Sequence, residues 1–121
     1  FILKKGLKDA IKRANAYSKA GADAILIHSK NNSPKEIFSF AKVFSKSKYY
    51  KPLVAVPSTY SKTTEKQLEK NGFRIVIYAN HMLRAAYPSM MITARSILEN
   101  QRSSPAEKNL ESIKKILNLI K

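Results

Sequence analysis

The pattern of apolar and polar positions predicts three helix–strand units followed by two more helices. Apolar residues recur at helical spacing over residues 7–17, 37–44, 83–98 and 110–120, and a further helix is expected between residues 63 and 72. Short, mainly apolar runs at residues 24–27, 53–56 and 73–78 have the length and composition of buried strands. Gly21 and Gly72 each end a predicted helix just before a strand. The predicted order is therefore α, β, α, β, α, β, α, α.

Strands that alternate with helices predict a parallel sheet built from right-handed crossovers. Three such strands are too few for a stable independent domain, and a (β/α)8 barrel takes about 250 residues. We therefore predict half of a (β/α)8 barrel in residues 1–100, with a linker and a final helix in residues 101–121. The chain begins with Phe1 rather than methionine, and we expect it to be a piece of a larger protein. An open doubly wound sheet is the alternative, but neither a G-x-G-x-x-G run nor a P-loop is present.

Capping patterns predict where several helices begin. Ser33, followed by Pro34 and Glu36, has the form of a capping box, and the same pattern recurs at Ser104. Asn80 is a predicted N-cap for the long fourth helix. Pro88 lies inside that helix, where we expect it to cause a kink or a local restart.

The charge adds a second functional hypothesis. The chain has 23 Lys and Arg against 8 Asp and Glu, for a formal charge of +15, which raises the alternative of a basic nucleic-acid-binding module. The lysines are scattered, however, and no aromatic residues interleave with a basic stripe. We therefore favour a lysine-rich solvated surface without a nucleic-acid partner. The absence of cysteine excludes disulfides and thiolate chemistry, and no apolar run approaches the length of a membrane span, so we expect a cytoplasmic protein.

Candidate chemistry gathers at the carboxyl ends of the predicted strands, where barrels and open α/β sheets bind ligands. The only two histidines, His28 and His81, both follow strands, as do Ser58 and Asn80. His28 is either an active-site residue or an ordinary loop histidine. Ser58 could be a turn residue, Asn80 a helix cap, and His81 a residue of the first helical turn. No paired carboxylates stand at these strand ends, so these residues alone predict no metal site.

Three runs of residues resemble a known family. Residues 21–30 read G-A-D-A-I-L-I-H-S-K, residues 52–58 read P-L-V-A-V-P-S, and residues 78–88 read Y-A-N-H-M-L-R-A-A-Y-P. They resemble the C-terminal half of phosphoenolpyruvate mutases, members of the isocitrate lyase superfamily. The resemblance covers essentially the whole chain. The chain departs from the family pattern at Ser58, Tyr78 and Lys115, where threonine, tryptophan and glutamate are usual.

The resemblance implies a C-terminal half of a (β/α)8 barrel and an enzyme that interconverts phosphoenolpyruvate and phosphonopyruvate in phosphonate biosynthesis. It implies Mg2+ as the cofactor, with the metal ligands and the gating loop upstream of residue 1, so we expect the 121 residues alone to be inactive. His28 maps onto a substrate-holding histidine, while Ser58 and Asn80 are substrate-binding candidates by their positions at strand ends. The resemblance also implies a homo-oligomer with exchanged C-terminal helices. A phosphonopyruvate hydrolase or a C–C lyase of the same superfamily stays an alternative.

Overall fold

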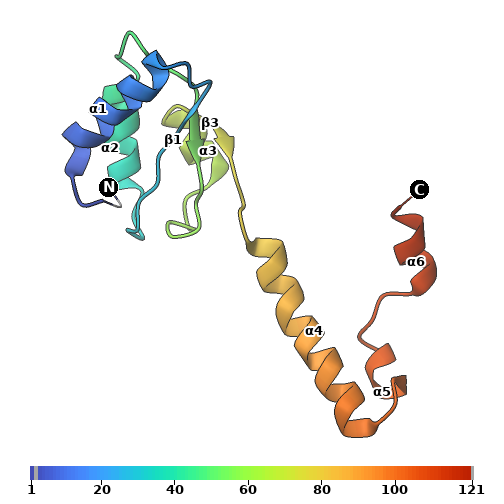
Figure 1. The fold of residues 1–121 in the computed structure, drawn as a ribbon. Helices are drawn as coiled ribbons and strands as arrows, with labels where there is room; N and C mark the ends of the chain where they lie inside the picture. The colour runs from blue at the N-terminus through green and yellow to red at the C-terminus, as the bar shows by residue number, and fades with distance from the viewer. Residues whose placement is uncertain (2, 121) are drawn as a thin grey trace. The chain divides into compact units, whose positions relative to one another are not determined.

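The computed structural model describes residues 1 and 3–120, whose contacts divide into two units, one reaching to Ala79 and the other beginning at Asn80. The first unit alternates helices and strands as predicted (Figure 1). Its elements are α1 (Gly6–Lys19), β1 (Ile25–Leu26), α2 (Lys35–Phe44), β2 (Leu53–Ala55), α3 (Glu65–Lys70) and β3 (Phe73–Val76). The predicted division at residue 100, between a barrel half and a linker with a final helix, refers to the complete barrel and stays a prediction.

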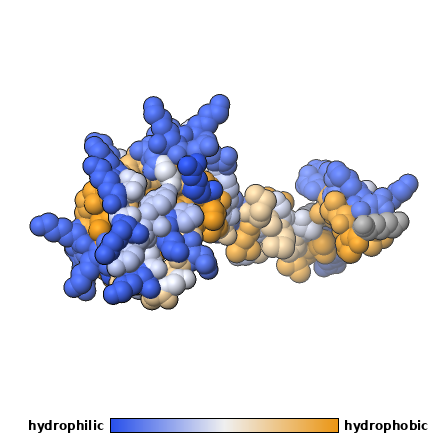
Figure 2. Space-filling view, turned by 90° about the horizontal axis from the view of Figure 1, so that it is seen from above, coloured by the Kyte–Doolittle hydropathy of each residue, from blue (hydrophilic) through white to orange (hydrophobic). Residues whose placement is uncertain are grey.

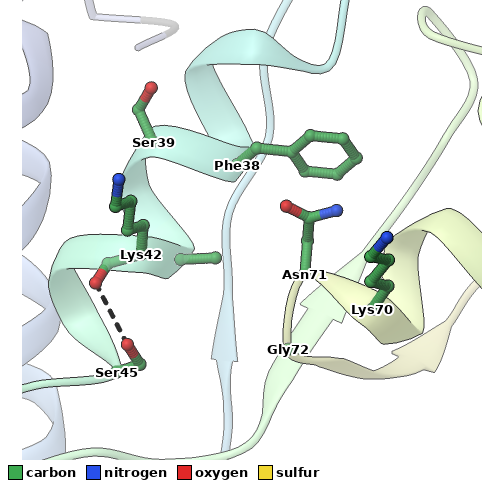
Figure 3. A pocket seen from close by; sticks show the side chains of 8 residues that line it. Phe38, Ser39, Lys42, Ser45, Lys70, Asn71 and Gly72 are labelled. Carbon is green, nitrogen blue, oxygen red and sulfur yellow. Dashed lines mark hydrogen bonds between the residues drawn. The ribbon is translucent and has the colours of Figure 1, made fainter.

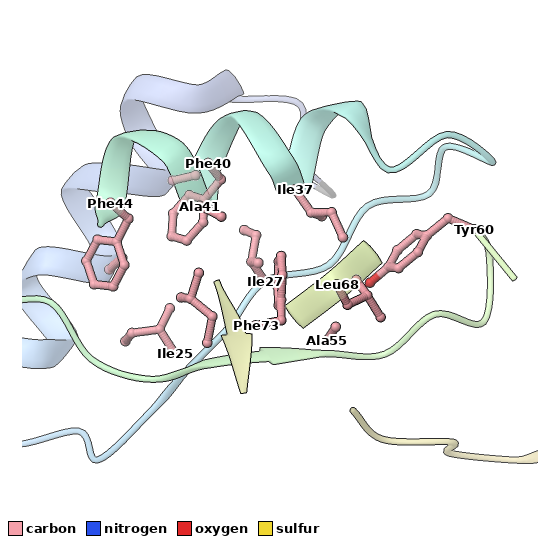
Figure 4. Close-up of a cluster of buried hydrophobic side chains, with 13 residues drawn as sticks. Ile25, Ile27, Ile37, Phe40, Ala41, Phe44, Ala55, Tyr60, Leu68 and Phe73 are labelled. Atoms are coloured by element: carbon pink, nitrogen blue, oxygen red, sulfur yellow. The ribbon is translucent and has the colours of Figure 1, made fainter. Parts of the chain in front are cut away.

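The three strands form a parallel sheet in the order β1-β2-β3, which confirms the predicted architecture. The core lies on one face of this sheet, where the three helices of the first unit pack (Figure 4). Helix α2 contributes its apolar stripe, and the strands contribute the residues that face it. The largest fully buried side chains of the cluster are Tyr60, Phe40, Phe44, Phe73, Ile37, Leu53 and Leu68.

The opposite face of the sheet is much more open. Leu26 and Ile75 are 52% and 47% exposed, whereas Val54, which lies between them on the central strand, is 8% exposed. The three residues pair across the sheet and form one apolar row. In a closed barrel the helices cover the outer face and the inward side chains form the packed interior. If the three strands belong to a barrel as predicted, the open face of the sheet corresponds to the barrel interior.

A bulge in β3 breaks the simple alternation of faces. Leu53 pairs with Phe73, but the next residue, Val54, pairs with Ile75, so Arg74 is an extra residue in the third strand. Phe73 consequently faces the helices and is buried, while Ile75 lies on the open face. One extra residue in a ladder shifts every later side chain to the other face.

Helix starts were predicted with mixed success. The capping box at Ser33 is wrong: α2 begins after Pro34, the Ser33 hydroxyl accepts from the N–H of Lys35 at 3.4 Å rather than from that of Glu36, and the Glu36 carboxylate bonds to Ser29. The capping box at Ser104 is also wrong, since α5 (Ser104–Glu107) lacks a side-chain cap. By contrast, Thr64 and Gln67 form a complete capping box at the start of α3.

The second unit consists of α4 (His81–Asn100), α5 and α6 (Ile113–Asn118), so the single last helix that we predicted is two short helices. Asn80 is the N-cap position of α4, but its side chain makes no capping hydrogen bond. Pro88 does not restart the helix, which runs as one element from His81 to Asn100. No helix within the described part of the chain combines the length and apolar character that crossing a membrane requires.

The surfaces of the two units differ in character. Figure 2 shows hydrophilic side chains over most of the visible surface of the first unit, in keeping with its many exposed lysines. In the second unit, α4 has no buried residue, and large apolar side chains are exposed along it. These exposed residues are Met82, Leu83, Tyr87, Met90, Met91, Ile92, Ile97 and Leu98. The apolar stripe of α4 therefore has no covering layer within its own unit.

Candidate functional site

The segments that follow β1 and β2 lie together at the carboxyl edge of the sheet. His28 follows β1 and is half-buried, and Ser58 follows β2 and is also half-buried. The backbone N–H of Ser58 donates to the carbonyl of Val56 at 2.9 Å, which turns the chain sharply away from the strand. Two of the predicted site residues thus occupy the edge at which parallel α/β folds bind ligands.

A hydrogen bond joins the two segments directly. The Thr59 hydroxyl donates to the backbone carbonyl of Ser29 at 2.7 Å, although 30 residues separate them in sequence. Ser29 is fully buried, and its own hydroxyl donates to the carboxylate of Glu36 in the first turn of α2. The backbone N–H of Asn31 donates to that same serine oxygen at 3.0 Å. Ser29, which directly follows His28, is therefore tied to a neighbouring loop, to a helix and to its own loop.

Tyr60 packs beside His28. The centroids of the two rings are 6.1 Å apart, and their planes are inclined by 43°. The tyrosine is fully buried in the core, and burial raises the pKa of its hydroxyl, while the nearby Val56 backbone acts in the opposite direction. The enclosed Nδ1 atom of His28 has no hydrogen-bond partner among the described residues. Buried polar atoms are nearly always hydrogen-bonded, so this unsatisfied nitrogen distinguishes His28 among the residues at this edge of the sheet.

The other two candidates begin the second unit. Asn80 is exposed, and its backbone carbonyl accepts a hydrogen bond from the N–H of Arg84 at 3.0 Å. His81 is the first residue of α4 and is half-buried, as expected for a residue of the first helical turn. The structure therefore brings the His28 and Ser58 segments together, whereas Asn80 and His81 take part in the start of α4.

The described residues do not supply a metal centre. No group of three or more His, Cys, Asp or Glu side chains within residues 1 and 3–120 is arranged to hold an ion. Glu36, the carboxylate beside the candidate site, is occupied by the Ser29 hydroxyl. These described side chains therefore do not fit the role of Mg2+ ligands.

A hollow of about 500 Å3 lies elsewhere in the first unit, between α2 and the turn from α3 to β3 (Figure 3). Its lining includes Phe38, Lys42, Lys70 and Asn71. The turn that it borders leads into β3 and so lies at the amino end of that strand. Barrel enzymes place stabilising contacts at this end and catalysis at the other. The hollow is therefore a groove between two outer helices and not part of the candidate site.

Sequence reasoning missed four residues of this neighbourhood, Ser29, Glu36, Thr59 and Tyr60, of which Ser29 directly follows the predicted His28. Thr59 and Tyr60 come directly after the predicted Ser58, so their position at a strand end was an available signal. Glu36 was assigned to a capping box because its spacing from Ser33 fitted that pattern, yet its carboxylate bonds to Ser29. Ser29 and Ser33 both offer a hydrogen-bond donor within reach of this carboxylate, and sequence spacing alone does not decide which of them it bonds.

The chain is similar to known proteins over almost its full length. A sequence model of the family described as phosphoenolpyruvate phosphomutase matches residues 1–98. A phosphoenolpyruvate phosphomutase of Tetrahymena pyriformis is 40% identical over 98% of this chain and 39% of its own length. A phosphonopyruvate hydrolase of Variovorax sp. (strain Pal2) is 39% identical over 94% of this chain and 39% of its own length.

A solved structure supports the same relationship. The crystal structure of phosphonopyruvate hydrolase in complex with oxalate and Mg2+ superposes with a TM-score of 0.80 at 37% identity, over 94% of this chain and 40% of that one. The chain thus spans about two fifths of the length of these relatives. Three parallel strands with flanking helices, followed by further helices, confirm the predicted fold class of the C-terminal half of a (β/α)8 barrel. The chain belongs to the phosphoenolpyruvate phosphomutase family.

Proposed function

We propose that this chain is part of a phosphoenolpyruvate mutase, an isomerase of phosphonate biosynthesis that interconverts phosphoenolpyruvate and phosphonopyruvate. The observation that carries the proposal is the position of the H-S-K run, residues 28–30, just beyond the carboxyl end of β1 in a chain that belongs to this family. The longer enzyme to which the chain would contribute these strands is called the intact protein.

The proposed reaction moves a phosphoryl group within one molecule. The phosphorus–oxygen bond of phosphoenolpyruvate breaks and a phosphorus–carbon bond forms at the methylene carbon, which leaves a ketone where the enol oxygen was. Negative charge develops on the oxygens around the transferring group, and a fixed donor directed at such an oxygen lowers the barrier. We propose that His28 is that donor. Its Nδ1 is enclosed by the chain, so Nε2 is the nitrogen that can meet a substrate.

Mg2+ belongs to the proposal for the intact protein, supported by the hydrolase structure that contains Mg2+ and oxalate. When bound, a divalent ion of this kind neutralises and orients carboxylate and enolate oxygens. The described side chains offer it no ligand group, so their proposed work is confined to binding and orienting the substrate.

A second candidate function is phosphonopyruvate hydrolysis. The hydrolase from Variovorax is 39% identical to this chain and the phosphomutase from Tetrahymena 40%, so identity does not separate the two activities. Hydrolysis would transfer the phosphoryl group to water and release pyruvate and phosphate. The gating loop that the resemblance places upstream of residue 1 would decide whether water reaches the reacting group. A C–C lyase is a third candidate. The names of these two relatives refer to phosphoenolpyruvate and phosphonopyruvate and not to a C–C lyase, so they favour the first two activities.

The intact protein incubated with phosphonopyruvate and Mg2+ should produce phosphoenolpyruvate, and phosphorus NMR measures this directly because phosphonate, phosphate ester and free phosphate resonate separately. The isolated 121 residues should show no turnover, because the described side chains hold no metal group. If free phosphate and pyruvate were the only products, the intact protein would be a hydrolase and not a mutase. No consumption of phosphonopyruvate by the intact protein would contradict both activities, and turnover by the isolated chain would contradict the assignment of missing parts.

We further propose that the intact protein is a homo-oligomer that exchanges its C-terminal helices. Support comes from the apolar stripe of α4, which the second unit leaves uncovered: Leu98, for example, is 77% exposed. Glutamate placed on this stripe should dissociate the oligomer, because a charge on a buried apolar contact costs far more than one on a rim. Packing of the stripe on the same barrel is the alternative.

Sedimentation at micromolar concentration tests the exchange. The intact protein should sediment as an oligomer, the Leu98→Glu variant should sediment as smaller species, and Ser89→Glu should not change the assembly. Ser89 is an exposed residue of the same helix and lies on the side opposite Leu98 by helical spacing. A monomeric intact protein, or equal behaviour of the two variants, would contradict the exchange.

The partners that we propose are otherwise small molecules in the cytoplasm. The nucleic-acid-binding alternative rested on the charge of +15 alone. By contrast, the two relatives described above are enzymes by name, and each matches 94% or more of this chain. Binding to nucleic acid would reveal itself by a steep dependence on salt concentration.

A further inference from the structure

The residue after His28 is held more firmly than a surface loop residue needs to be. Ser29 is fully buried and takes part in three hydrogen bonds: its hydroxyl donates to Glu36, that oxygen accepts from the Asn31 N–H, and its carbonyl accepts from the Thr59 hydroxyl. Two of these bonds come from outside the loop. Since the backbone of Ser29 is continuous with that of His28, they restrict where the imidazole can lie.

The imidazole itself lies beside an aromatic ring. Tyr60 presents its ring to His28 at a centroid separation of 6.1 Å, and no hydrogen bond holds the enclosed Nδ1 among the described residues. Figure 4 shows the Tyr60 side chain entering the core from the loop after β2, with its oxygen at the inner end. Because Tyr60 is fully buried in the core cluster, its ring is held in place beside the His28 imidazole.

We propose that Glu36, acting through Ser29, and Tyr60, acting through ring contact, are positioning residues for His28. The proposal rests on the proposed function, because orientation of the imidazole matters only if His28 meets the substrate. Catalytic groups need to be held within about 0.5 Å of their productive place, and displacement by about 1 Å can cost on the order of 100-fold in rate. A purely structural role would affect stability and would not depend on His28.

A pair of substitutions at Glu36 separates these roles in the intact protein. Glu36→Leu removes the acceptor for the Ser29 hydroxyl and should lower kcat by on the order of 10- to 100-fold with little change in KM. Glu36→Gln keeps a carbonyl oxygen that can accept the same bond and should stay within about 3-fold of the unmodified protein, since only the bond geometry is needed. Tyr60→Leu and Tyr60→Phe form a second pair, in which loss of the ring lowers kcat and loss of the hydroxyl alone, with the ring kept, does not.

The decisive measurement repeats the damaging substitutions in a His28→Ala background. If Glu36 and Tyr60 act through His28, Glu36→Leu and Tyr60→Leu should have almost no further effect on kcat there, because residues that act as a unit are not additive. Equal losses in both backgrounds, or an unchanged kcat for Glu36→Leu and Tyr60→Leu in the presence of His28, would overturn the positioning role and leave the proposed function standing. If one leucine variant does not fold, the other pair decides. A near-normal kcat for His28→Ala alone would overturn the role of His28 and, with it, this inference.

Discussion

Replacing His28 by alanine in the intact protein is expected to lower kcat by on the order of 100- to 1,000-fold, the usual loss when one preorganised donor to a developing charge is removed. The effect should fall on kcat more than on the thermal midpoint. His28 is a half-buried residue beyond the end of β1, so its removal takes little surface out of the core. Steady-state turnover and thermal unfolding of the same preparation provide both measurements.

His81→Ala is the matched control, because the chain contains only two histidines and both follow strands. His81 lies in the first turn of α4, so its loss should reduce turnover much less. A His28→Ala variant with near-normal kcat, or one that fails mainly by unfolding, would make His28 a structural histidine. The comparison therefore separates a role in the reaction from a general intolerance of histidine loss.

Phe40→Ala is expected to reduce the free energy of unfolding by about 3–5 kcal/mol, the range for loss of a fully buried aromatic side chain. Phe40 is 0% exposed, and its ring stacks on that of Phe44 with centroids 5.4 Å apart. The substitution leaves a cavity between α2 and the sheet that the surrounding side chains cannot fill without moving. A loss of this size is a large part of the stability of a domain, so the variant should unfold at much lower denaturant concentration.

Val43→Ala on the same helix provides the reference. Val43 is 46% exposed, and its truncation should stay within about 0.5 kcal/mol, as is usual for surface positions. Chemical denaturation of the two variants beside the unmodified protein gives the difference directly. Similar losses for the two variants would mean that the side of α2 that we describe as buried does not face the core of the folded protein.

The fold was predictable because each element carries its own periodic signal. The apolar stripe of α2 and the short runs of β1 and β2 gave the correct types and order, and alternation of helices with strands gave the parallel sheet. The ends of elements were less predictable. The predicted strands were longer than β1, β2 and β3, and the last predicted helix proved to be two, because end positions depend on tertiary contacts that periodicity does not record.

The candidate site was predictable only where topology alone decides position. His28 and Ser58 could be placed at one edge of the sheet because they follow parallel strands. Glu36 could not, because its carboxylate had two serines within reach, and the buried Ser29 prevailed over the exposed Ser33. The role of Tyr60 as a core residue in contact with His28 depends on how its loop folds back, which local sequence does not specify.

The bulge at Arg74 affects how this strand should be aligned with relatives and how mutational scans of it should be interpreted. Strict alternation would assign Phe73 and Ile75 to the same environment, although one is buried beneath the helices and the other lies in the apolar row of the opposite face. A one-residue gap placed here by an alignment is therefore not a neutral choice, since it exchanges the two environments for every later position of β3. Substitution tolerances measured at residues 73 and 75 should be compared with those of Leu53 and Val54, their respective neighbours in the ladder, and not with each other.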